Sequence, residues 1–270
     1  MPYDVPQTEL APAQATEAVL NHLARYRLTV FAALERLPVF SAAGPRQIKN
    51  VLRDCQRQSL VGSAPLHHGA KYWYVDTAGA ERCGLSELRI GPLSEPAKLR
   101  ALALLRFCCL SDKPRHRLTP DDLSRHFPSL YRPGLPSGYY FDPAGSGRLG
   151  LARIDAGRRG RWDRVLQSLR ADINDHVHKP GFQRFIEAGR FEITVLTVFR
   201  QKARRIHESL AQVADAHRIP LQVVALPELL PLIGSGRERR CFDHSYFFDS
   251  PPWVSTLLAL EHGKTTGNRP

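Results

Sequence analysis

The sequence lacks the short motifs that mark several common enzyme and cofactor sites. It contains no Walker A loop, no Gly-x-Gly-x-x-Gly segment and no Ser-His or Cys-His arrangement of the kind that activates a nucleophile. Its five cysteines form no Cys-x-x-Cys pair and follow no zinc-finger spacing. Scattered cysteines of this kind are typical of reduced core residues, so we expect neither a disulfide framework nor a cysteine-based zinc module.

Long hydrophobic runs are also missing. The longest apolar stretches, residues 101–105 and 193–199, are far too short to span a bilayer. The first residues show neither the basic segment nor the apolar segment of a secretory signal. We therefore expect a cytoplasmic protein with no membrane partner.

Acidic residues are scarce relative to basic ones. The 270 residues include 38 Lys and Arg against 26 Asp and Glu, which gives a formal net charge of +12. Such an excess favours polyanionic partners and salt-sensitive association with them. A chain of this length with 43% hydrophobic residues can bury a substantial core, and we expect two domains.

Residues 29–77 contain the element order of a winged helix-turn-helix, a compact DNA-binding module. Residues 28–37 are expected to form a short helix with Thr29 as its N-cap, and Pro45 opens a second helix at a position where its missing N–H is not needed. An apolar strand, a polar turn and an aromatic strand follow in that order. Their expected residues are 59–62, 67–69 and 72–75.

The second helix, residues 45–58, carries two stripes. Its apolar stripe repeats at helical spacing and is expected to face a core, whereas its basic stripe is expected to enter the major groove of double-stranded DNA. The alternative is a small α+β subdomain with an ordinary solvated basic face. The apolar stripe consists of Ile48, Leu52 and Cys55. The predicted DNA contacts are Arg46, Lys49, Asn50, Arg53 and Arg57 on the helix, with His68 and Lys71 on the adjacent hairpin.

The second half of the chain has the pattern of an α/β domain with a mixed sheet. A hairpin is followed by helix, strand, helix and strand. The expected elements are strands at 139–142, 149–155, 191–199 and 221–226, and helices at 98–110, 162–178, 202–216 and 227–233, with Thr119 capping a further short helix. We therefore predict a disordered segment at 1–15, a winged-helix domain at 16–90, an α/β domain at 97–234 and an irregular tail at 235–270.

The same element order is the skeleton of the restriction-endonuclease-like, PD-(D/E)xK, fold. Those nucleases hold Mg²⁺ between carboxylates on two neighbouring strands. Asp142 and Asp155 are the candidate catalytic pair, because each lies at the end of a strand of the predicted hairpin. The alternative is that Asp142 begins a turn and that Asp155 pairs with Arg153, Arg158 or Arg159.

Two basic clusters in this half are candidate phosphate sites. Arg158, Arg159 and Arg161 precede the long helix, and a second cluster lies at the start of the helix that follows residue 199. Each cluster is equally compatible with a solvated surface.

The chain resembles the replication-relaxation family of plasmids and integrative elements over residues 16–234. The most similar pieces are residues 71–76, 150–155, 193–199 and 202–206. The resemblance implies a winged helix joined to a restriction-endonuclease-like domain, and a role in plasmid replication, mobilisation or transcriptional control. Members of the family typically carry Glu-x-Asp on the strand that matches residues 153–155, and a lysine in the next helix.

This chain departs from that pattern. Asp155 matches, but Arg153 stands in place of the acidic residue, and the predicted helix 162–178 contains no lysine. A positive charge at that position should repel a divalent cation. We therefore expect a nuclease-like domain that has lost cleavage and needs no cofactor.

Two other functions stay open at this stage. The first is an active Mg²⁺-dependent endonuclease that uses Asp142 and Asp155. The second is a protein-interaction adaptor whose basic surface binds an acidic partner instead of DNA. A homodimer and an element-encoded protein partner also stay open.

Overall fold

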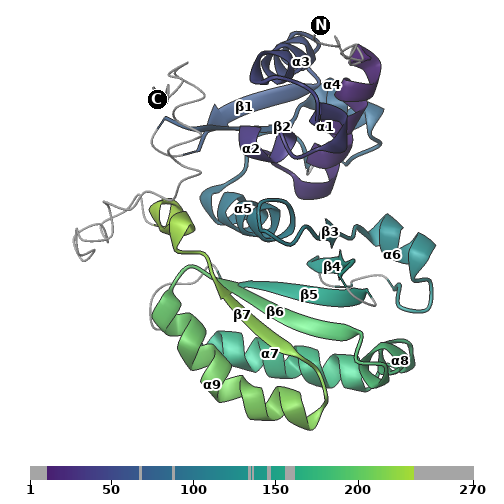
Figure 1. Cartoon of the computed structure of the whole chain (residues 1–270), viewed down its shortest axis with the longest axis vertical. Helices are drawn as coiled ribbons and strands as arrows, with labels where there is room; N and C mark the ends of the chain where they lie inside the picture. Colours follow the sequence, from purple (N-terminus) through teal and green to yellow (C-terminus); the bar gives the residue numbers. More distant parts are fainter. Residues whose placement is uncertain are drawn as a thin grey trace, which may run out of the picture. The chain divides into compact units, whose positions relative to one another are not determined.

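The computed structural model describes residues 11–66, 69–86, 89–132, 135, 137–144, 147–155 and 162–233, and for 162 and 211–216 only the backbone. The described chain divides into two compact units (Figure 1), which we call unit 1, up to Ser94, and unit 2, from Glu95 onwards. Helices and strands occur in both, and the larger sheet is mixed, so the fold class is α+β.

Unit 1 is built from short helices around a two-stranded antiparallel sheet. Its core comes from apolar side chains spaced along α1 and α3, with Leu20, Leu23, Ile48 and Leu52 all buried. Its elements are α1 (Pro12–Tyr26), α2 (Phe31–Leu34), the 3₁₀ helix η1 (Pro38–Phe40), α3 (Pro45–Arg57), β1 (Val61–Pro65), β2 (Lys71–Val75) and α4 (Thr77–Arg82).

The prediction for Thr29 is wrong. Instead of capping a helix over 28–37, Thr29 forms an isolated antiparallel bridge with Trp73 of β2, with both backbone N–H···O distances 3.0 Å. The helix is confined to Phe31–Leu34 and its N-cap is Val30. Pairing with the hairpin satisfies the backbone groups of Thr29, which is fully buried, and so overrides its capping preference.

The predicted disorder of residues 1–15 is wrong for its last part. Residues 1–10 lie outside the described residues, but α1 already begins at Pro12, and Ala15 is fully buried. Proline is favoured in the first turn of a helix, where its missing N–H has no intrahelical partner. The predicted tail at 235–270 also lies outside the described residues.

Unit 2 contains one five-stranded sheet in the order β3-β4-β5-β6-β7. β4 is antiparallel to both of its neighbours, whereas β5, β6 and β7 are parallel to one another. The elements are α5 (Glu95–Cys109), β3 (His116–Arg117), α6 (Pro120–His126), β4 (Tyr139–Asp142), β5 (Arg148–Asp155), α7 (Trp162–Val177), α8 (Pro180–Glu187), β6 (Phe191–Thr197), α9 (Arg200–Ala216), β7 (Leu221–Ala225) and the 3₁₀ helix η3 (Pro227–Leu232).

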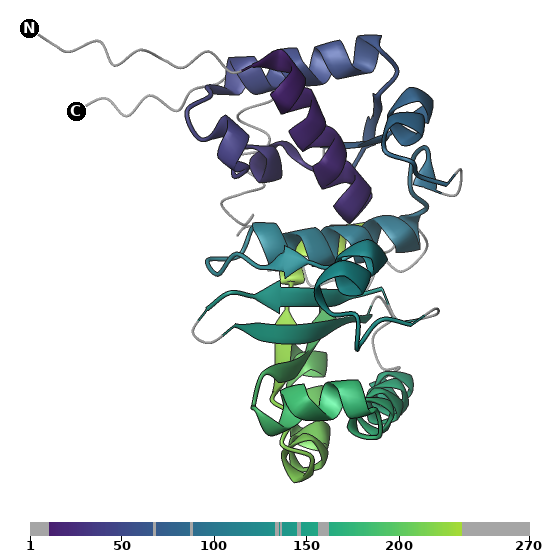
Figure 2. The same cartoon turned by 90° about the vertical axis from the view of Figure 1, so that its right-hand side faces the viewer.

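Helices cover both faces of this sheet (Figures 1 and 2). α5 lies on one face, and α7, α8 and α9 lie on the other. The core on the second face includes Leu151 and Ile193 of the sheet together with Leu169, Phe182 and Ile206 of the helices. Every residue of β6 is buried, as its run of β-branched and apolar residues predicts for a central strand.

Local sequence signals specify several boundaries in unit 2. The predicted cap at Thr119 is confirmed: its hydroxyl accepts a hydrogen bond from the Asp122 N–H at 3.1 Å, and Asp122 Oδ2 accepts one from the Thr119 N–H at 2.8 Å. The predicted end of the long helix near residue 178 is also confirmed, since α7 ends at Val177. The sequence interpretation missed α8, because Pro180 both ends one helix and opens the next.

Within the described residues, no helix combines the length and the apolar character needed to cross a membrane.

Candidate nucleic-acid interface

Packing fixes the rotation of α3. Ile48, Leu52 and Cys55 lie on its inner side and are at most 3% exposed. At its start, the Gly44 N–H donates to Gln47 Oε1 at 3.1 Å, and Pro45 occupies the first helical position. The opposite side of a helix held in this way must face solvent.

The five α3 residues predicted to contact DNA all lie on that exposed side. We call this set the α3 face. It consists of Arg46, Lys49, Asn50, Arg53 and Arg57.

The α3 face has neighbours within unit 1: Lys49 Nζ lies 5.9 Å from the centre of the Phe31 ring, and Arg57 has an acidic neighbour in Asp54. Arg57 Nη1 lies 3.5 Å from Asp54 Oδ1 one turn earlier, and these side chains are 72% and 59% exposed. Arg53 Nη1 donates to Asn50 Oδ1 at 3.3 Å. An exposed ion pair of this kind contributes about 0.5 kcal/mol, so a phosphate can displace Asp54 from Arg57 at little cost.

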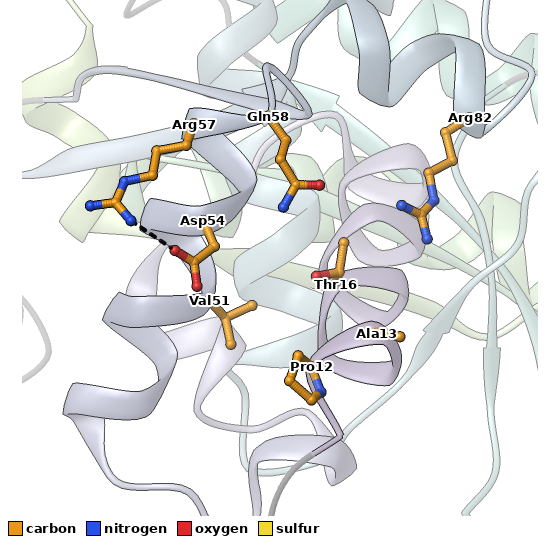
Figure 3. A pocket seen from close by; sticks show the side chains of 8 residues that line it. All are labelled: Pro12, Ala13, Thr16, Val51, Asp54, Arg57, Gln58 and Arg82. Atoms are coloured by element: carbon orange, nitrogen blue, oxygen red, sulfur yellow. Dashed lines mark hydrogen bonds and ion pairs between the residues drawn. The ribbon is translucent and has the colours of Figure 1, made fainter.

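The two flanks of α3 differ. On one flank, Gln56 Nε2 donates to Ser63 Oγ at 3.1 Å and so links α3 to the hairpin, whose second strand begins with the exposed Lys71. The other flank borders an open hollow of about 350 Å³ between α1 and α3 (Figure 3), at whose edge Arg82 pairs with Glu17. The lining residues are Pro12, Ala13, Thr16, Val51, Asp54, Arg57, Gln58 and Arg82. His68, the predicted contact at the hairpin turn, lies outside the described residues.

The prediction that Asp142 and Asp155 converge on one metal ion is wrong. Asp142 pairs in register with Arg148, the first residue of β5, whereas Asp155 is the last residue of that strand. Seven residues of extended chain separate these positions by about 23 Å. Mg²⁺ holds its ligands at about 2.1 Å, so the two carboxylates cannot bind the same ion.

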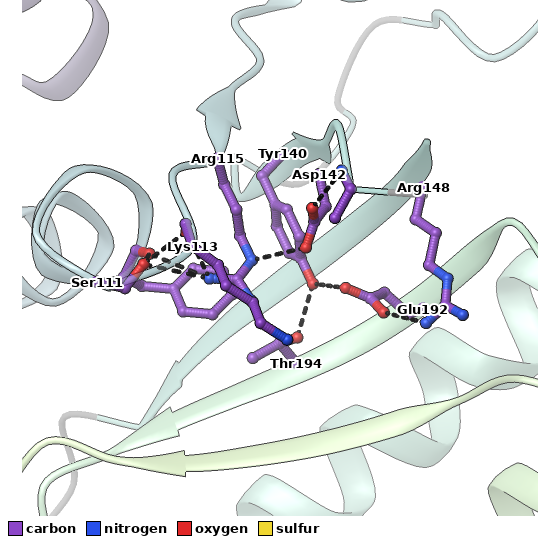
Figure 4. Close-up of polar contacts among 10 residues, drawn as sticks. Ser111, Lys113, Arg115, Tyr140, Asp142, Arg148, Glu192 and Thr194 are labelled. Carbon is purple, nitrogen blue, oxygen red and sulfur yellow. Dashed lines mark hydrogen bonds and ion pairs between the residues drawn. The ribbon is translucent and has the colours of Figure 1, made fainter. Parts of the chain in front are cut away.

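Asp142 instead has a structural role. Its Oδ1 accepts a hydrogen bond from the Ala144 N–H at 2.9 Å, which forms the turn that the alternative interpretation proposed. Its Oδ2 lies 3.2 Å from Nε of Arg115 (Figure 4). The guanidinium carbon of Arg115 lies 4.2 Å from the centre of the Phe107 ring. Both charged side chains are largely buried.

A glycine allows a neighbouring tyrosine to reach across β5. Tyr140 and Glu192 both pair in register with Gly150, from opposite sides. A Cβ on Gly150 would lie 2.0 Å from the Tyr140 ring. The Tyr140 hydroxyl therefore passes over β5 and donates to Glu192 Oε1 at 2.6 Å, with Thr194 Oγ1 at 2.7 Å (Figure 4). Burial and the adjacent Glu192 raise the pKa of Tyr140.

Asp155 lies at the carboxyl end of β5 in a buried ion pair that the sequence interpretation missed. Its Oδ2 is 2.7 Å from Lys202 Nζ, and the two side chains are 3% and 5% exposed. The Thr197 hydroxyl donates to the same oxygen at 3.1 Å. Of the three partners that the alternative interpretation proposed for Asp155, Arg153 instead forms its ion pair with Asp172 of α7, and Arg158 and Arg159 lie outside the described residues.

One sequence signal could have identified Lys202. It falls on the inward stripe of α9 with Ile206 and Leu210, both fully buried, and a lysine in such a stripe needs a buried acidic partner. The carboxylate of Asp155 is therefore matched by a cation of the chain itself.

One of the two predicted phosphate sites lies outside the described residues. It consists of Arg158, Arg159 and Arg161. Among the residues that the structure describes, no three His, Cys, Asp or Glu side chains are grouped so that they could hold a metal ion.

Comparison with known proteins found no family model, no curated protein and no solved structure that matches this chain.

Proposed function

We propose that this protein binds double-stranded DNA, with the α3 face in the major groove. The observation that carries the proposal is the exposed set Arg46, Lys49, Asn50, Arg53 and Arg57 on a helix whose other side is fixed in a core. Arginine and lysine neutralise phosphates, and arginine and asparagine also pair with base edges.

The order of elements in unit 1 supports this proposal. α2, η1 and α3 precede the β1–β2 hairpin, and the Thr29–Trp73 bridge adds a third extended segment to it. This is the arrangement expected of a winged helix-turn-helix, in which the second helix enters the groove and the hairpin lies along the backbone. Lys71, exposed at the start of β2, would then contact a phosphate.

We further propose that unit 2 is a restriction-endonuclease-like domain without cleavage activity. Its hairpin, crossover helices and parallel strands follow that order of elements. The separation of Asp142 from Asp155 and the pairing of Asp155 with Lys202 argue against a two-carboxylate Mg²⁺ site. A role in plasmid replication, mobilisation or transcriptional control stays a prediction that rests on the family resemblance alone.

The first prediction concerns charge reversal on α3. Arg53→Glu combined with Arg57→Glu should weaken binding to a labelled 30-base-pair duplex by about 100-fold, because two contacts to phosphate at roughly 1.5 kcal/mol each are lost. Fluorescence anisotropy measures the affinity, and thermal unfolding checks that both proteins are folded.

A matched control distinguishes the effect of where the substitutions lie from the effect of the change in net charge. Arg164→Glu with Arg170→Glu makes the same change in net charge at two exposed positions of α7. This variant should bind nearly as well as the wild type. Equal weakening in both variants, or a folded α3 variant with unchanged affinity, would mean that α3 is not the interface.

The adaptor alternative gives a different pattern. In that case the protein would not bind the duplex probe, and a pull-down after nuclease treatment would still capture an acidic protein. These two results together would show that a protein, not DNA, is the partner.

A further inference from the structure

A second basic surface lies on α9 in unit 2. Packing fixes the rotation of this helix, since Ile206 and Leu210 are fully buried in the core and Lys202 is turned inward to Asp155. The neighbouring residues Arg200, Arg204 and Arg205 are therefore turned outward, and all three are exposed. We call these three the α9 arginines.

The α9 arginines have no partner among the residues that the structure describes. Among the described residues, none of them forms an ion pair or a side-chain hydrogen bond, whereas Arg132, Arg148 and Arg153 of the same unit each pair with a carboxylate. Glu208 is the one acidic residue of α9 whose side chain the structure describes, and it forms no ion pair with these arginines.

The spacing of these residues concentrates charge. Arg200 and Arg204 are separated by four positions, so they lie on the same side of α9, and Arg205 follows directly. α7 covers the same face of the sheet (Figures 1 and 2), but there Arg164 and Arg170 are six positions apart, and the helix also carries Asp163, Asp172 and Asp175. The outer side of α9 is therefore the more strongly basic of the two helices.

We propose that the α9 arginines form a second contact with the phosphate backbone of DNA, separate from the α3 face. The proposal rests on DNA being the partner of unit 1, and it adds a sequence-independent contact made by unit 2. Phosphate is the partner that this surface fits, because arginine side chains bind phosphate oxygens in a fixed, two-pronged geometry and read no sequence when they do so.

The second prediction follows from counterion release. Each lost phosphate contact lowers the magnitude of the slope of log K against log salt by about 0.9. Arg200→Glu with Arg204→Glu should therefore lower that magnitude by about 2 for the full chain on a 30-base-pair duplex. Arg164→Glu with Arg170→Glu serves again as the control with the same net charge and should leave the slope unchanged.

The outcomes distinguish this proposal from the one for α3. Equal slopes for the α9 variant and the α7 control, in folded proteins, would overturn the contact on α9 whatever the α3 variant does. If the salt slope changes in the α9 variant while the α3 variant binds DNA with unchanged affinity, the DNA interface lies on unit 2 and not on α3. Arg200→Gln with Arg204→Gln, which should lower the slope equally, replaces the glutamate variant if that variant fails to fold.

Discussion

At the scale of single residues, we expect a buried histidine in each unit to make the stability of that unit depend on pH. His22 of α1 is 6% exposed and packs 4.8 Å from the Tyr26 ring, and its Nε2 has no hydrogen-bond partner among the described residues. Burial, with a smaller effect of Arg25, lowers its pKa to about 4. His176 of unit 2 is fully buried against Tyr139, and burial also lowers its pKa.

The third prediction concerns His22. Because its folded pKa lies below the unfolded value of 6.5, the unfolded chain binds the proton more tightly, and stability falls as pH drops through the range from 6.5 to 4. Between pH 7 and pH 5 this group should remove about 2 kcal/mol from the free energy of unfolding. His22→Phe, measured by urea unfolding at both pH values, should lose less stability on acidification than the wild type. An identical loss in the two proteins would show that His22 is not the titrating group.

Residue-level signals account for much of what could be predicted in the candidate interface. The spacing of Ile48, Leu52 and Cys55 against Arg53 and Arg57 is sufficient to orient α3, because a helix in a small unit must bury its apolar side. The pairing of Asp155 with Lys202 could not be predicted in the same way. It depends on which ends of β5 and α9 meet in space, and no local pattern encodes that.

At the scale of elements, register decides which side chains meet. Asp142 and Asp155 are both strand ends in the sequence, but an antiparallel hairpin places the end of β4 beside the start of β5. Thr29 is a second example. Its local sequence predicts a helix cap, but its actual partner, Trp73, is distant in sequence. Long periodic helices such as α3, α7 and α9 could be predicted, whereas the two-residue strand β3 carries no pattern of its own.

The fourth prediction concerns the link between β5 and α9. Lys202→Met should destabilise unit 2 by about 3 to 5 kcal/mol, because it leaves the buried carboxylate of Asp155 without its cation. Adding Asp155→Asn to this variant should restore part of the loss, since the unpaired charge is then removed as well. Chemical denaturation of the three proteins measures the effect. A Lys202→Met protein as stable as the wild type would contradict a structural role for the pair.

At the scale of the whole molecule, some basic side chains pair with carboxylates of the fold and others are exposed to solvent. Arginines of unit 2 such as Arg115, Arg148 and Arg153 are bound to carboxylates of the fold. The α3 face and the α9 arginines are two basic sets that the described structure leaves exposed on helices whose opposite side is buried. Net charge alone predicts a polyanionic partner, but only the packing of each helix indicates which cations are exposed to solvent.

The fifth prediction tests the central proposal most directly, by site-specific photo-cross-linking of the full chain to duplex DNA. A benzophenone amino acid in place of Asn50, in the middle of the α3 face, should cross-link to the duplex, and excess unlabelled duplex should suppress the product. The same amino acid in place of Ser124, an exposed residue of α6, should give little product. If the protein binds the duplex but position 50 cross-links no more than position 124, α3 does not lie on DNA.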